Sequence, residues 1–136
     1  MAALGFLFAD EVAPDEVLRL VAEVLGVPGA NVGRYNDADM PDAPVIVQIV
    51  ARVPDFRTDV SVFADDTLLG DLRDIELAAR VSKRSGRVTL ATAPDRAEPF
   101  WVLVQPDGRQ LLVRQTSETD AGIAVGPPLE TVREAD

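Results

Sequence analysis

Three aspartates and a tyrosine stand close together in a proline- and glycine-rich stretch of the chain. Tyr35 precedes Asp37, Asp39 and Asp42 within residues 27–44, which we expect to form an irregular loop of 18 residues. Carboxylates bind arginine and lysine side chains through strong charge-assisted hydrogen bonds. A calcium loop would need a glycine at its sixth position and a glutamate at its twelfth, and this stretch has neither. We therefore predict that these four residues contact a basic partner, with a solvated loop as the alternative.

The chain contains neither histidine nor cysteine. These residues most often carry acid–base chemistry, nucleophilic relays and transition-metal binding. Carboxylates are numerous, but Asp71, Asp74 and Glu76 fall where the solvated face of a helix would place them, so no catalytic pair stands out. We predict that the protein is not an enzyme and binds no cofactor or metal. A metal-assisted carboxylate enzyme is the alternative.

The net charge of −10 is distributed unevenly along the chain. Residues 1–66 carry 12 acids and 4 bases, residues 67–115 carry 6 acids and 8 bases, and residues 116–136 carry 5 acids and 1 base. This charge disfavours nucleic acids and anionic membranes, and it attracts a basic protein toward the first half of the chain. No basic residue precedes the apolar N-terminal run, and no run reaches the about 18 apolar residues of a membrane span. We expect a soluble, cytoplasmic protein.

Apolar periodicity and turn signals predict the elements that must position these residues. In the second predicted helix, Leu68, Leu72, Ile75 and Ala79 recur at helical spacing. Pro106, Asp107 and Gly108 form the turn of a C-terminal hairpin. The predicted helices cover residues 14–26 and 68–86, and the predicted strands cover residues 4–9, 45–53, 57–64, 87–92, 100–105 and 109–115.

This order of elements predicts an α+β fold. Strand, helix, strand, strand, helix, strand is the order of a ferredoxin-like two-layer sandwich with both helices on one face, and the C-terminal hairpin is added to it. We expect residues 1–115 to form this single domain. Residues 116–136 are expected to form an acidic tail that could lie on the sheet.

The predicted sheet face turned away from the helices is more apolar than a solvated face should be. We expect a cover over it, which could be the tail, a protein partner or a second copy in a homodimer. Phe63 and Trp101 are the predicted anchors for a partner, because large aromatic side chains supply most contact area. The apolar residues expected on this face are Ile46, Val50, Phe63, Trp101 and Leu103, with Leu112 as a further candidate.

The second predicted helix carries two further features. Leu77 and Val81 fall outside its main stripe, where packing under a neighbouring loop is the simpler interpretation than a partner site. Basic residues gather at its end, where they favour the helix dipole, and a phosphate site is the weaker interpretation. These basic residues are Arg80, Lys83, Arg84 and Arg87.

The run GDLRDIELAARVSKRSGRVTLATAPDRAEPFWVLVQPDG resembles the C-terminal part of small bacterial immunity proteins, which are encoded beside polymorphic toxins. The resemblance lies in the succession of a helix, a strand and a hairpin that bears an aromatic residue and a Pro-Asp-Gly turn. It implies a stoichiometric inhibitor that covers the active site of a basic toxin domain, and it transfers no individual residue role. The alternative function is a small-molecule sensor domain that binds its ligand as a dimer.

Overall fold

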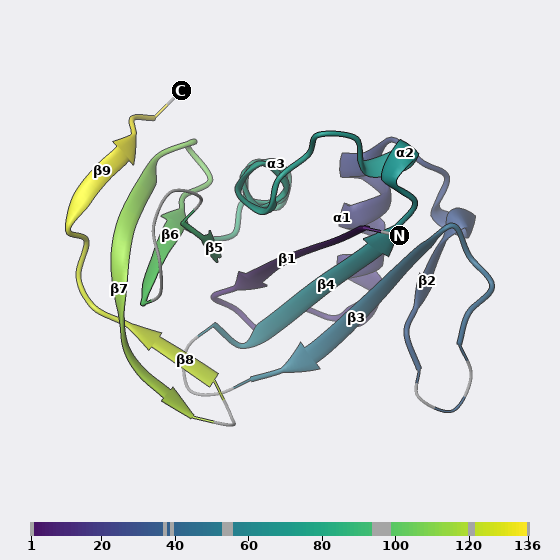
Figure 1. The fold of residues 1–136 in the computed structure, drawn as a ribbon, viewed down its shortest axis with the longest axis horizontal. Helices are drawn as coiled ribbons and strands as arrows, with labels where there is room; N and C mark the ends of the chain where they lie inside the picture. Colours follow the sequence, from purple (N-terminus) through teal and green to yellow (C-terminus); the bar gives the residue numbers. More distant parts are fainter. Residues whose placement is uncertain are drawn as a thin grey trace.

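The computed structural model describes residues 2–36, 38, 40–52, 56–93, 99–119 and 122–135. It shows an α+β protein in which one mixed sheet of nine strands packs against two main helices (Figure 1). The predicted α+β class and the placement of both helices on one face are confirmed. The elements are β1 (Ala2–Phe8), α1 (Pro14–Leu25), η1 (Gly29–Asn31), β2 (Val32–Arg34), β3 (Val45–Ala51), β4 (Thr58–Ala64), α2 (Asp66–Leu69), α3 (Asp74–Ser85), β5 (Thr89–Thr92), β6 (Phe100–Val104), β7 (Gln110–Thr119), β8 (Gly122–Val125) and β9 (Glu130–Arg133).

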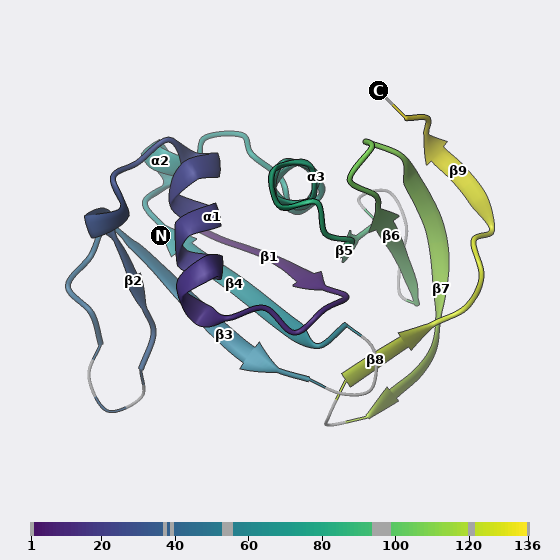
Figure 2. The same cartoon turned by 180° about the vertical axis from the view of Figure 1, so that it is seen from behind.

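The strands follow the order β2-β3-β4-β1-β5-β6-β7-β8, and β9 also pairs with β7. The short β2 is parallel to β3, and the other described pairs are antiparallel. The sheet bends, so that β6 and β7 turn away from β3 and β4 (Figure 1). The view from behind shows α1 beside α3 on the same side of the sheet (Figure 2).

The main core lies between these two helices and one face of the sheet. Pro14 begins α1 and Gly26, in the left-handed region at φ 70°, ends it, as the sequence predicts. Alternate residues of each strand face the helices because successive side chains of a strand point to opposite faces. The larger fully buried members of this core are Phe6, Phe8, Val17, Leu20, Val21, Val45, Val47, Val60, Val62, Leu77 and Val81. Within the described residues, no helix is both long and apolar enough to traverse a membrane.

The helix predicted over residues 68–86 is wrong at its start. Gly70 takes φ 58° and separates the short α2 from α3, which begins at Asp74. The break rotates the apolar stripe, so Leu68 is exposed while Leu77 and Val81 are fully buried against the sheet. The expectation that these two residues lie outside the packed face is therefore wrong.

Residues 27–44 also contain more structure than the irregular loop that the sequence predicts. After η1, the three residues of β2 pair with Val45–Val47 at the start of β3. A three-residue strand gives too short an alternation to be recognised from its sequence.

The C-terminal part of the chain extends the sheet. β6 and β7 form the predicted hairpin, in which Gly108 takes φ 94° at the turn. β7 continues beyond the predicted domain boundary at residue 115, and β8 and β9 both pair with it.

Candidate functional site

One opening in the sheet lies where β2 separates from β3. The Tyr35 amide donates to the Val47 carbonyl at 2.7 Å, and the chain then leaves the sheet. β3 continues to Ala51 without β2 beside it. A hollow lies between the end of β2 and the second half of β3.

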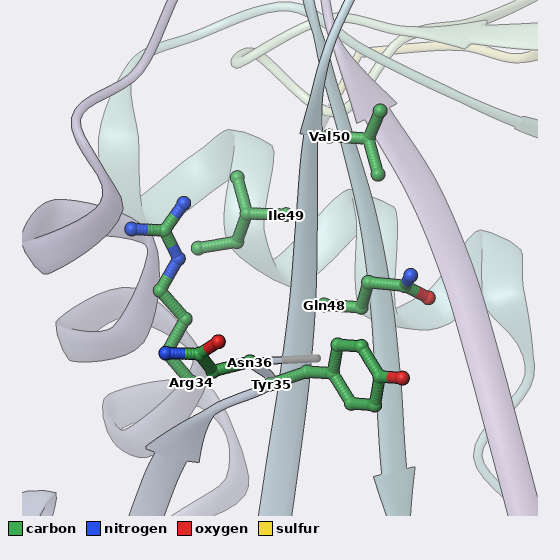
Figure 3. Close-up of a pocket in the computed structure, with 6 residues that line it drawn as sticks. All are labelled: Arg34, Tyr35, Asn36, Gln48, Ile49 and Val50. Carbon is green, nitrogen blue, oxygen red and sulfur yellow. The ribbon is translucent and has the colours of Figure 1, made fainter. Parts of the chain in front are cut away.

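This space is a hollow of about 490 Å³, which we call the edge pocket. Its lining comes from the end of β2, the two residues that follow, and the middle of β3 (Figure 3). The six lining residues are Arg34, Tyr35, Asn36, Gln48, Ile49 and Val50.

The two sides of the edge pocket differ in chemistry. Arg34 and Ile49 lie on one side of β3, whereas Tyr35, Gln48 and Val50 lie on the other (Figure 3). One side therefore offers a guanidinium beside an apolar surface, and the other an aromatic ring beside an amide. A ligand that contacts both sides of the edge pocket would meet a positive charge only on the side of Arg34 and Ile49.

Gly33 allows the chain after β2 to pack back onto β2. A Cβ atom at this position would lie 2.7 Å from the Cβ atom of Pro41 and 3.2 Å from that of Ala43. Such distances are well inside van der Waals contact, so only glycine permits this close approach. Pro41 and Ala43 thereby hold the returning segment against β2. The end of β2 forms one wall of the edge pocket.

The structure describes two of the four residues of the predicted acidic site. Tyr35 is half-buried and lines the edge pocket, and Asp42 is exposed. Asp37 and Asp39 lie outside the described residues. The predicted tyrosine therefore lies at a hollow, and the three aspartates follow it in the sequence.

The predicted apolar anchors lie in two separate places on the open face, the sheet face turned away from α1 and α3. Phe63 is half-buried on β4 opposite Ile46 of β3. Trp101 lies on β6, and β1 and β5 stand between it and β4. The structure therefore does not bring Phe63 and Trp101 together.

Trp101 belongs to a second cluster, which comprises the buried Leu7, Phe56, Leu90 and Val113. Trp101, Leu103 and, from β8, Ile123 and Val125 pack against this second cluster. The indole Nε1 donates to the Gln115 side chain at 2.8 Å. Residues of the predicted tail thus cover part of the open face.

The prediction that Leu112 lies on the open face is wrong. Leu112 pairs with Val102 and is buried in the main core. The turn sets Val104 opposite Gln110, and this register puts Val113 rather than Leu112 beside Trp101 on the open face.

Two of the four basic residues at the end of α3, Arg84 and Arg87, form ion pairs. Arg84 donates to the Glu23 carboxylate of α1 at 2.7 Å, and Arg87 bonds Asp10 and Glu16 at 3.1 Å each. The Arg84 hydrogen bond, followed by that of Arg19, lowers the pKa of Glu23 from its usual 4.5. The Arg84 contact connects the two helices. Both guanidinium groups are thus paired with carboxylates of the same chain.

The acids at the start of α3 have structural partners. Asp74 accepts hydrogen bonds from the Gly5 amide at 3.0 Å and from the Thr92 hydroxyl at 3.2 Å, and so joins β1 to β5 where these strands separate. Glu76 accepts from Arg73, whose hydrogen bond lowers the pKa of this carboxyl. Within the described ranges, no group of three or more acidic, histidine or cysteine residues is arranged to hold a metal ion.

Sequence reasoning missed the residues that surround Tyr35 in the edge pocket. Arg34 belongs to a strand too short to recognise, and Gln48 and Ile49 are ordinary residues of a predicted strand. Only the sheet order shows that β3 lies near an edge. The strand sequence carries no signal for that position.

Comparisons with models of protein families, with curated proteins and with solved structures found no match.

Proposed function

We propose that this chain is a non-catalytic protein-binding module of the immunity type, which binds a basic toxin or effector domain at the edge pocket and covers its active site. The observation that carries the proposal is the position of Tyr35. Its ring lines an open hollow and precedes the loop with Asp37, Asp39 and Asp42. Aromatic rings and carboxylates together form a favourable surface for arginine and lysine side chains.

The charge distribution supports a basic partner. Residues 1–66, which include the edge pocket, carry 12 acids and 4 bases. Arg84 pairs with Glu23, and Arg87 pairs with Asp10 and Glu16, so these two cations offset part of that charge and leave the region negative. A partner with a positive active site would be attracted to this part of the molecule.

We further interpret the central elements as a ferredoxin-like unit. The strands β3, β4, β1 and β5 are adjacent and antiparallel in that order, and α1 and α3 connect strands across one face. In this interpretation β2 and the strands β6 to β9 are additions at the two ends of the sheet. The addition of β2 creates the edge pocket.

Isothermal titration calorimetry with the purified product of the adjacent gene tests the proposal. We expect a one-to-one complex that abolishes the partner's activity. Tyr35→Ala and Asp42→Asn should each weaken binding by about tenfold, because each removes a contact to a basic side chain. Leu129→Ala is the matched control, since Leu129 is exposed at the opposite end of the sheet.

Two results would contradict the proposal. One is the absence of a complex when both proteins are folded. The other is unchanged affinity in the Tyr35→Ala, Asp42→Asn double variant. A thermal-shift assay with a panel of free metabolites distinguishes this proposal from the sensor alternative. A rise in melting temperature with one specific metabolite would favour a small-molecule ligand.

A further inference from the structure

The second half of β3 presents backbone groups to the outside of the sheet. The Arg52 amide donates to the Arg57 carbonyl on the β4 side, whereas the Val47 carbonyl accepts from Tyr35 on the β2 side. Backbone groups of successive strand residues alternate between the two edges. Ile49 and Ala51 therefore direct their N–H and C=O groups away from β4. Of the strands described, none pairs with these two residues on that side.

The two ends of the sheet differ in how they are protected. Between β8 and β9 the chain is interrupted at Gly126–Pro127–Pro128, and β9 carries Glu130 and Arg133. Prolines, charges and interruptions are the usual means of preventing strand pairing at an edge. The β3 segment Ile49-Val50-Ala51 has neither a proline nor a charge. This edge is therefore suited to accept another strand.

We propose that residues 49–51 of β3 bind an extended basic segment of the partner protein by strand addition; this inference rests on the proposed function of the edge pocket. Main-chain hydrogen bonds to Ile49 and Ala51 would supply affinity. The edge pocket provides the space beside β3 that the added strand enters.

The two sides of the edge pocket determine the pattern of the added segment. Side chains on the Tyr35 side meet an aromatic ring and the Gln48 amide, which favour lysine or arginine. Side chains on the other side meet Ile49, which favours apolar residues, and the Arg34 guanidinium, which disfavours basic ones. A slip by one residue would place basic side chains against Arg34. The occupant is thus a strand in which basic and apolar residues alternate.

The test uses a six-residue peptide that alternates lysine and valine, titrated into the isotopically labelled full chain. We expect the amide signals of Ile49 and Ala51 to shift and to exchange more slowly with solvent. Ala51→Pro should weaken peptide binding by about tenfold, because it removes an outward N–H without removing a bond to β4. Ala51→Gly keeps that N–H and is the matched control. A peptide that alternates glutamate and valine should bind much more weakly.

Several outcomes would overturn strand addition. These are binding that leaves the Ile49 and Ala51 amides unchanged, equal affinity in Ala51→Pro and Ala51→Gly, and equal affinity for the two peptides. A dimer of the free protein that dissociates in Ala51→Pro would assign this edge to a second copy instead. If Ala51→Pro still binds the adjacent gene's product with full affinity while Tyr35→Ala does not, strand addition fails and the proposed function stands.

Discussion

Gly33 shows how one residue without a side chain shapes the candidate site. Pro41 and Ala43 pack where its Cβ atom would lie. Gly33→Ala should therefore push the returning segment away from β2 and lower the free energy of unfolding by about 1–3 kcal/mol. Chemical denaturation measures this change.

Gly29→Ala is the matched control for this prediction. A Cβ atom at Gly29 would meet nothing within 4 Å, so the free energy of unfolding should change by less than about 0.5 kcal/mol. Equal effects of the two substitutions would show that the packing of Pro41 on Gly33 contributes nothing to stability.

Glu23 makes stability depend on pH through its bonds to Arg84 and Arg19. Its pKa in the folded protein is lower than the 4.5 of the unfolded chain. The stabilisation is therefore fully present above pH 4.5 and is lost as the pH falls through the folded-state pKa. Glu23→Gln should lower the melting temperature at pH 7, and its difference from the wild type should shrink below about pH 4.5.

Glu11→Gln is the control, because Glu11 is exposed and makes none of these bonds. Thermal unfolding between pH 3 and pH 7 gives the comparison. A constant difference between the wild type and Glu23→Gln across this range would contradict the assigned role of Glu23.

No local signal in the sequence shows where Tyr35 and Trp101 lie in the fold. The sequence predicts Tyr35 as a partner contact from its place beside three aspartates; its position at the edge pocket follows from the pairing of β2 with β3. The sequence predicts Trp101 as a partner anchor from its size; in the structure its indole bonds Gln115, and Ile123 and Val125 of β8 pack against the same cluster. Its surroundings depend on β8, whose folding back onto β7 could not be predicted from the alternation of β6.

At the scale of elements, β8 closes the second cluster over the open face. Ile123 and Val125 pack against Leu90, Val113 and their neighbours. Ile123→Asp should expose this apolar surface, lower the free energy of unfolding by about 2 kcal/mol and move the Trp101 fluorescence to longer wavelength. Trp101 is the only tryptophan, so its emission reports this site alone.

Val132→Asp provides the control for β8. Val132 is about half exposed on β9, so its substitution should leave the emission unchanged. If Ile123→Asp also leaves it unchanged, β8 does not cover Trp101 in solution.

The sequence predicts elements well where periodicity and turn residues agree. The β6–β7 hairpin follows from its Pro-Asp-Gly turn, and α1 from Pro14 and Gly26. The sequence predicts one unbroken helix over residues 68–86, because Gly70 does not by itself reveal a positive φ. β2 was missed because its stability comes from pairing with β3 rather than from its own three residues.

At the scale of the whole molecule, charge should control how fast a partner binds. The net charge of −10 is concentrated in residues 1–66 and 116–136, while residues 67–115 are slightly positive. The association rate constant with a basic partner should fall by about tenfold or more as ionic strength rises from about 0.05 to about 0.5 M. Stopped-flow measurement at several salt concentrations checks this. A rate that is independent of salt would contradict electrostatic steering.

We propose that the partner binds where β2 leaves β3. Hydrogen exchange over the whole chain, with and without the product of the adjacent gene, tests it most directly. We expect new protection at residues 34–36 and 48–51, with none on β9. Protection confined to β7, β8 and β9, with residues 48–51 unchanged, would contradict it.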